Sequence, residues 1–282
     1  MIKNIRQLKT INSIKINISI KNIIPDEIEQ FIIKKINKTP PQCYGIISDL
    51  ELDKINKMVF ETYNININKQ IIASIKSSYM KNYIIKNYFI LNKNSKIILK
   101  NFSKDGVLKL SAQFNLSPMS IIRFVFDHVY HKNIKELITS NKLSIYNQEQ
   151  YKLAEQNDIY VTLNQSTQQE QSILFEKQIE AFLIKNNVEY KTQEQLTQEQ
   201  IVKFGKAINT PDFLIISEFI INTKKINWID AKNFYGSNIE FIISKIKKQI
   251  KKYLESYGPG CIIFKHGFNS KLTFQNVIIL DY

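Results

Sequence analysis

The sequence predicts an all-α N-terminal region followed by an α/β domain in which helices flank a mixed sheet. Three observations predict this fold class. The chain has 282 residues with 44% hydrophobic content, which suffices for two separate cores. From residue 171 onward, short β-branched and aromatic runs alternate with helical patterns, whereas the first half shows helical patterns. The stretch between them is the most polar of the chain, as expected for a connector.

These observations divide the chain into four parts. We expect an N-terminal tail over 1–22, a helical region with helix–turn–helix units over 23–140, a polar connector over 141–170 and the α/β domain over 171–282. We also expect some helix to persist within the connector.

A helix–turn–helix pattern stands out in the helical region. We expect helices over 105–115 and 119–131, joined by a turn at 116–118. Ser117 is a favourable N-cap, and Pro118 fits the first position of a helix. The unit has the size of a DNA-reading element, with its second helix as the recognition helix.

Arg123 is the candidate DNA contact on that second helix. It is one of two arginines in the chain and lies three positions after Ser120, on the expected outer face. The alternative is a plain helical bundle, because most other residues of this helix are apolar. A helical set over 25–63 is a candidate second copy of the unit.

The α/β domain is predicted element by element. We expect first a helix over 171–186, a strand over 188–190 and a polar segment over 193–208 with a short helix at the cleft rim. Strands over 213–216 and 226–229 follow, with a polar loop at 222–225 between them. An amphipathic helix over 239–256 then ends at Gly258-Pro259-Gly260 and is followed by buried strands over 261–264 and 277–280.

Two carboxylates and a lysine occupy the edges of two of these strands. Asp212 follows Thr-Pro, and Asp230 lies 18 positions later, two residues before Lys232. Two adjacent strands can bring the acids together to hold a hard divalent cation. Lys232 alternates onto the same face of its strand as Asp230, where it can orient or polarise a water molecule.

The alternative interpretation of this pattern is a hairpin with two surface acids and a solvated lysine. In a chain with 39 lysines and arginines, an acid two positions before a lysine arises readily by chance. The buried runs beside both acids favour the site, because an unpaired carboxylate at the edge of a buried strand is costly and usually has a ligand.

Three further residues are candidates for the same site. Glu176, on the first helix of the domain, can add a catalytic or metal ligand, although Glu170 and Glu180 compete for this role. Gln249 and Tyr253 lie four positions apart on the amphipathic helix, so one face can present both to the substrate. For this pair, core packing is the equal alternative.

Several stretches resemble a known family. Asn-Thr-Pro-Asp-Phe, Trp-Ile-Asp-Ala-Lys, the Gln-x8-Gly-Pro-Gly pattern and Ile-Ile-Phe-Lys-His-Gly-Phe look like the TPD-motif proteins, the codanin-interacting nuclease family of the PD-(D/E)xK superfamily. The resemblance is strongest over 170–270. It departs at Asp230, where the family's glutamate would be expected, although the superfamily motif accepts either acid.

The resemblance implies a restriction-endonuclease-like fold and a divalent-metal nuclease. Carried over residue by residue, it implies Mg²⁺ or Mn²⁺ held by Asp212, Asp230, the Ala231 carbonyl and Glu176, with Lys232 catalytic. It also implies a protein of the nucleus, and also of the cytoplasm, that works beside a codanin-type partner. The expected activity is hydrolysis of phosphodiester bonds in DNA, including branched DNA, by a monomer or homodimer; the alternative is a weakly catalytic or non-catalytic scaffold.

Composition limits the other classes of function. The net charge of +14 favours a polyanionic partner, although the abundance of Ile, Asn and Lys throughout the chain accounts for part of it. Cys43 and Cys261 are too few for a zinc ribbon or a disulfide framework. His128 and His131 share a helix face but lack further ligands. We expect no membrane span, secretory signal or glycine-rich phosphate loop.

Overall fold

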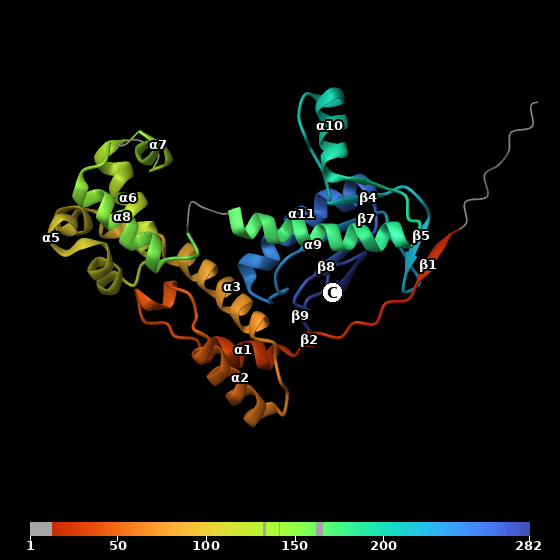
Figure 1. The fold of residues 1–282 in the computed structure, drawn as a ribbon, viewed down its shortest axis with the longest axis horizontal. Helices are drawn as coiled ribbons and strands as arrows, with labels where there is room; N and C mark the ends of the chain where they lie inside the picture. Colours follow the sequence, from red (N-terminus) through yellow and green to blue (C-terminus); the bar gives the residue numbers. More distant parts are fainter. Residues whose placement is uncertain (1–12, 132–133, 141, 162–165) are drawn as a thin grey trace, which may run out of the picture. The chain divides into compact units, whose positions relative to one another are not determined.

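The computed structural model describes residues 13–131, 134–140, 142–161 and 166–282, and in it the chain forms two compact units. The helical unit contains Pro25–Thr167 together with Ile239–Ile242, and the sheet unit contains the first 24 residues, Gln168–Asn238 and Ile243–Tyr282. Figure 1 shows the elements of both units along the chain. In the described parts of the chain, no helix combines the length and apolar character needed to cross a membrane.

The helical unit begins after a short strand and includes a 3-10 turn. Its elements are α1 (Asp26–Lys35), η1 (Gln42–Tyr44), α2 (Asp49–Tyr63), α3 (Lys69–Asn87), α4 (Phe89–Lys93), α5 (Ser95–Phe114), α6 (Pro118–Tyr130), α7 (Ile134–Thr139) and α8 (Ile145–Asn157). A core formed largely by α5, α6 and α8 buries Phe102, Leu110, Ile122 and Phe126.

The expected helix–turn–helix is present as α5 and α6. The Ser117 hydroxyl accepts a hydrogen bond from the Ser120 N–H at 3.1 Å, and Pro118 occupies the first turn, so the predicted N-cap is confirmed. Asn115 ends α5 in the left-handed conformation. The first helix begins earlier than expected, at Ser95, with a kink at Gly106, where φ is 69°.

The sheet unit is built on a five-stranded mixed sheet in the order β10-β8-β7-β4-β3. Its elements are α9 (Ser166–Lys185), β3 (Tyr190–Thr192), α10 (Gln193–Phe204), β4 (Phe213–Ile215), β5 (Phe219–Ile221), β6 (Lys224–Lys225), β7 (Trp228–Lys232), α11 (Glu240–Tyr257), β8 (Gly260–Phe264), β9 (Phe268–Asn269) and β10 (Val277–Asp281). Strands β7, β8 and β10 are parallel, whereas β4 is antiparallel to both β7 and β3.

The two long helices of this unit pack on opposite faces of the sheet. Phe175, Ile179 and Leu183 of α9 pack in one core cluster with Ile229 and Cys261. The alternate residues of β7 face α11, where the rings of Trp228 and Tyr253 lie 5.1 Å apart. The predicted α/β class, with helices flanking a mixed sheet, is therefore correct at this level.

The segment expected as a tail over 1–22 contributes to the sheet unit from residue 13 onward; its first 12 residues lie outside the described part. β1 (Ile14–Ile16) pairs in parallel with β5, and β2 (Ile23–Ile24) pairs with β9. The Asp281 carboxylate accepts hydrogen bonds from the backbone N–H groups of Lys21 and Asn22. These partners are remote in sequence, which is why no local pattern marks the strands.

The hairpin of the α/β domain also differs in detail from the expectation. A separate hairpin, β5–β6, is inserted between β4 and β7, and its turn is formed by Asn222 and Thr223 with φ of 47° and 72°. Lys224–Lys225, expected within the loop, is strand β6. The polar segment contains α10, as predicted, with a capping box at Thr192 and Gln195.

The boundary between the units falls at the end of the expected connector. The two units divide between Thr167 and Gln168. The connector contains α8, whose Ala154 is fully buried in the core of the helical unit. Residues 141 and 162–165 of the connector lie outside the described residues.

Gly260 permits the close packing of β7 against the start of β8. A Cβ at this position would lie 2.0 Å from the Trp228 ring, so no larger residue fits. The Trp228 indole N–H donates to the Gly258 carbonyl at 2.8 Å, and Gly258, with φ of 77°, follows the last residue of α11. The Gly-Pro-Gly stop predicted from the sequence therefore also positions the β7 strand.

Candidate active site

Strand register brings Asp212 and Asp230 together. In the antiparallel β4–β7 pair, Phe213 lies opposite Ile229, so the next positions of the two strands are Asp212 and Asp230. At these positions the backbone pairing of the two strands ends. The Asp212 carboxylate instead accepts a hydrogen bond from the Ala231 backbone N–H at 2.6 Å. Asp212, one residue before β4, therefore lies opposite Asp230 at the middle of β7.

The backbone of β7 contributes one carbonyl oxygen, that of Ala231, to the candidate site. The N–H and C=O groups of one strand residue point to the same side of the strand. Since the Ala231 N–H points toward Asp212, its carbonyl points to that side as well. The Lys232 carbonyl points the opposite way and accepts from Lys265 of the neighbouring chain segment at 3.0 Å.

A polar network on the α11 side of β7 holds the second acid and the lysine. Asp230 is only 2% exposed and forms an ion pair with the Lys232 ammonium. The same ammonium donates to Gln249 Oε1 at 2.9 Å, and the Gln249 amide donates to Asp230 at 3.3 Å and to the Tyr253 hydroxyl at 2.9 Å. Gln249 therefore contacts the side chains of Asp230 and Lys232 directly, and the Tyr253 hydroxyl is linked to them through Gln249.

The electrostatics of the centre reflect an excess of negative charge. Burial raises the pKa of Asp212 well above the ordinary carboxyl value, and the neighbouring Asp230 raises it further. The hydrogen bond from Ala231 and the charge of Lys232 act in the opposite direction but do not cancel these effects. A carboxylate in such surroundings gains from a second cation.

Glu176 approaches this centre from α9. Partial burial raises its pKa, the Asp230 charge raises it further, and Lys232 lowers it. These mutual effects place the Glu176 carboxyl within electrostatic range of the pair. Of its competitors, Glu180 accepts a hydrogen bond from the Tyr190 hydroxyl at 2.8 Å, and Glu170 is exposed at the start of α9.

The Thr-Pro-Asp segment is anchored from α10 and α11 by the predicted Tyr253 and by two residues that the sequence analysis did not identify, Tyr257 and Gln200. The Tyr253 hydroxyl donates to the Thr210 carbonyl at 3.3 Å, and the Tyr257 hydroxyl donates to the Asn209 carbonyl at 2.6 Å. Gln200 donates to the same Asn209 carbonyl at 2.6 Å. The four-residue spacing of Tyr253 and Tyr257 could have indicated that α11 presents both hydroxyls to one loop.

Arg123 belongs to the helical unit, whereas the candidate site lies in the sheet unit. The Arg123 guanidinium donates to the Val161 carbonyl at 3.0 Å and is partly buried. Ser120, expected beside it on an outer face, is 7% exposed. The expectation of an outward-facing pair on α6 is therefore wrong, because the last residues described before position 162 cover this side of the helix.

The donor set fits a hard divalent cation. Asp212, Asp230, the Ala231 carbonyl and Glu176 offer only oxygen atoms, which Mg²⁺ and Mn²⁺ prefer, and the raised pKa of Asp212 reports the negative charge that such an ion would neutralise. Among the described residues, no three His, Cys, Asp or Glu side chains are already arranged as a metal-holding group. Lys232 is the cation that contacts Asp230 in this arrangement.

Comparison with known proteins places the chain among relatives whose activity is not described. The family described as "Protein of unknown function TPD sequence-motif" matches residues 130–282. The uncharacterized protein L539 of Acanthamoeba polyphaga mimivirus is 28% identical over 274 residues, which cover 80% of this chain and 95% of that protein. No solved structure matches the chain significantly.

Proposed function

The chain belongs to the TPD sequence-motif family, and we propose that it is a divalent-metal-dependent nuclease with a restriction-endonuclease-like domain that hydrolyses phosphodiester bonds in DNA. The observation that carries this proposal is the meeting of Asp212, Asp230 and Lys232 at the junction of β4 and β7. The mixed sheet with α9 and α11 on its two faces supports the fold assignment, and the net charge of +14 supports a polyanionic substrate.

The residues of the centre divide the chemistry among themselves. Asp212, Asp230, the Ala231 carbonyl and Glu176 would hold Mg²⁺ or Mn²⁺, which when bound supplies Lewis-acid stabilisation of charge on the phosphate and lowers the pKa of a bound water. Lys232 places a positive charge beside the scissile phosphate and can orient the attacking water.

Gln249 has a positioning role in this account. It holds the Lys232 ammonium at 2.9 Å and is itself held by Tyr253, so the orientation of the lysine depends on α11. A fixed cation in a partly buried site stabilises developing charge more strongly than a mobile one, because it needs no reorganisation during the reaction.

The direct test is cleavage of a labelled panel of single-stranded, duplex, flap and four-way-junction DNA with Mg²⁺ or Mn²⁺. The wild type should cut at least one member, and Asp212→Asn, prepared identically, should not. Glu218→Gln, an exposed acid between β4 and β5, is the matched control and should cut normally. Equal cutting by wild type and Asp212→Asn would contradict the proposal.

One observation favours a second candidate. The Lys232 ammonium already pairs with Asp230, as expected for a domain that keeps the fold with little turnover. In that case the protein is a scaffold that works with a codanin-type partner. Normal DNA binding without metal-dependent cleavage across the whole panel would favour this alternative.

A further inference from the structure

The outer face of α11 carries a continuous band of positive charge. Its lysines are all exposed: Lys245, Lys247, Lys248, Lys251 and Lys252. Residues three or four positions apart are neighbours on a helix surface, so Lys252, Lys248, Lys251 and Lys247 follow one another in such steps. Lys245 and Lys252 flank Gln249, which contacts the candidate active site. The band therefore runs from the active-site side of α11 to its opposite flank.

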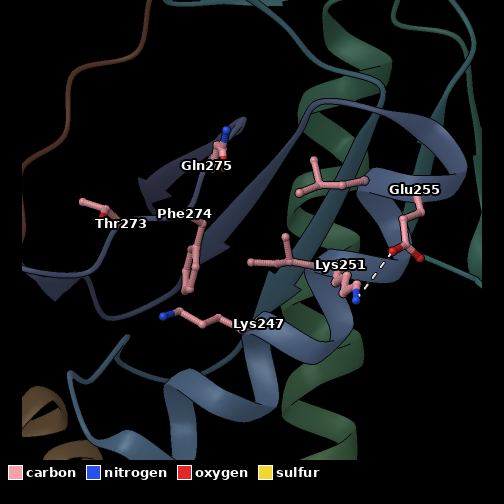
Figure 2. A pocket seen from close by; sticks show the side chains of 8 residues that line it. Lys247, Lys251, Glu255, Thr273, Phe274 and Gln275 are labelled. Carbon is pink, nitrogen blue, oxygen red and sulfur yellow. Dashed lines mark ion pairs between the residues drawn. The ribbon is translucent and has the colours of Figure 1, made fainter.

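At that opposite flank the band ends in a hollow with an aromatic wall. Figure 2 shows Phe274, from the segment before β10, extending toward α11 beside Lys247. The open hollow measures about 410 Å³. Ile250 and Leu254 contribute its apolar part, and its charged groups are those of Lys247, Lys251 and Glu255.

The ring of Phe274 is presented by an ordered turn. The Val277 N–H donates to the Phe274 carbonyl at 3.3 Å, and Leu272, two residues earlier, is 4% exposed in the core. Phe274 itself is half-buried, so part of its ring remains available to a ligand. The Lys251 ammonium lies 3.9 Å from the Glu255 carboxylate, and both side chains are largely exposed. Such a surface ion pair is weak, so the lysine charge remains accessible to a ligand.

We propose that this hollow and the lysine band form a path for a single-stranded segment of the nucleic acid, with an unpaired base stacked on Phe274 and flanking phosphates on Lys247 and Lys251. This inference rests on the proposed action on nucleic acid and adds the place where an unpaired strand is held. In a single strand each base is flanked by phosphates, so an aromatic ring flanked by lysines can bind both groups. A base can stack on a side chain only when it is not stacked on neighbouring bases, as in an unpaired strand.

Two other partners of a basic helix fit less well. A membrane surface would need an exposed apolar face, but the apolar stripe of α11, including Ile246 and Ile250, is buried in its own unit. An acidic protein would satisfy the lysines without using the ring of Phe274. The nucleic-acid assignment accounts for both the charge and the aromatic wall.

The test measures binding of a fluorescein-labelled single-stranded oligonucleotide to the full chain by anisotropy in EDTA, where metal-dependent cleavage does not occur. For Lys247→Gln/Lys251→Gln, the slope of log K against log salt should fall in magnitude by about 1.4, since each single-strand phosphate contact contributes roughly 0.7. The matched control, Lys224→Gln/Lys225→Gln, removes the same charge from exposed β6 and should leave the slope unchanged.

A second arm isolates the stacking contact. Phe274→Ala should weaken binding of a normal strand about tenfold, as expected for loss of one stacked base, and should not affect an abasic strand of equal length. Phe274→Trp keeps an aromatic surface and should retain affinity, which separates stacking from any loss of stability in the alanine variant. Phe204→Ala, on exposed α10, is the aromatic control.

The outcomes are separable from those of the cleavage test. Equal slopes for the two lysine pairs, or equal effects of Phe274→Ala on normal and abasic strands, would overturn the strand path even if the protein cuts DNA. Polyglutamate competing as well as an oligonucleotide of equal charge would also overturn it. Binding as expected without cleavage would support the path and contradict the nuclease.

Discussion

Each unit of the protein buries an acidic centre, and the two centres are surrounded differently. In the helical unit, fully buried Asp158 accepts hydrogen bonds from the Ser117 hydroxyl and from the backbone N–H groups of Met119, Tyr160 and Val161 at 3.0–3.2 Å. In the sheet unit, Asp230 is paired with a lysine and raises the pKa of a second carboxylate, Asp212.

The difference separates a structural acid from a candidate functional one. Burial raises the pKa of Asp158, and the hydrogen bonds around it lower that pKa, so each of its neighbours supports the charge. Asp212 has a like charge as its neighbour, which opposes ionisation. Lys232 pairs with Asp230 but does not cancel the raised pKa of Asp212, so this crowding supports the proposal of a cation site.

The largest expected effect on stability is at Asp158. Asp158→Ala removes the acceptor of four hydrogen bonds in a buried place, so the free energy of unfolding should fall by about 3 kcal/mol or more. Asp158→Asn keeps an acceptor oxygen and should lose less. Urea unfolding measures both. A stability equal to wild type for the alanine variant would mean that this acid does not organise the helical unit.

Lys232→Met should reduce activity strongly, although less than Asp212→Asn. Loss of a fixed charge beside the phosphate should lower the cleavage rate about 10²–10³-fold. The affinity for Mn²⁺ should stay equal or increase, because the positive charge that competes for Asp230 is gone. Single-turnover cleavage and a Mn²⁺ titration measure the two quantities. Unchanged cleavage would remove Lys232 from the catalytic assignment.

The metal-free protein should lose stability with rising pH, and Asp212 should cause this loss. Its pKa is raised in the folded state, so its ionisation opposes folding: stability is fully present below the ordinary carboxyl pKa of about 4 and falls as pH rises through the raised pKa. The melting temperature should fall by a few degrees over this window.

Two additions identify the source of that pH dependence. Asp212→Asn should flatten the decline, because the amide does not ionise, and saturating Mg²⁺ should offset it in the wild type, because the ion stabilises the charged form. Melting curves measured from pH 5 to 9, with EDTA or Mg²⁺, compare these conditions. A decline of equal size in Asp212→Asn would assign it to other groups.

The smallest expected effect is at Tyr253. Tyr253→Phe removes a hydroxyl that accepts from Gln249 and donates to the Thr210 carbonyl, so the free energy of unfolding should fall by about 1 kcal/mol. The ring remains against Trp228, and Mn²⁺ affinity should therefore be nearly unchanged. A large loss of Mn²⁺ affinity would show that the hydroxyl positions the acids more directly than this account holds.

Much of the site was predictable because its determinants are local. Strand-length apolar runs beside Asp212 and Asp230 predicted two strands, and alternation placed Lys232 on the same face as Asp230. The four-residue spacing of Gln249 and Tyr253 predicted a shared helix face, and the structure directs that face to β7.

The parts that escaped prediction depend on distant partners. Ile14–Ile16 is too short to signal a strand, and its partner β5 lies more than 200 residues away in the chain. The local sequence predicts an outer face for Arg123, because the segment at Val161 that covers it follows two helices later. Asp158, in a polar stretch, carries no local sign that four donors converge on it.

A Mn²⁺ titration followed by electron paramagnetic resonance, on wild type, Asp212→Asn and Asp158→Asn, tests whether Asp212 and Asp230 form a cation site. We expect the wild type and folded Asp158→Asn to bind Mn²⁺ with similar affinity, whereas Asp212→Asn should lose this binding. Equal binding by wild type and Asp212→Asn, or no binding by the wild type, would contradict the assignment of the Asp212–Asp230 centre as a cation site.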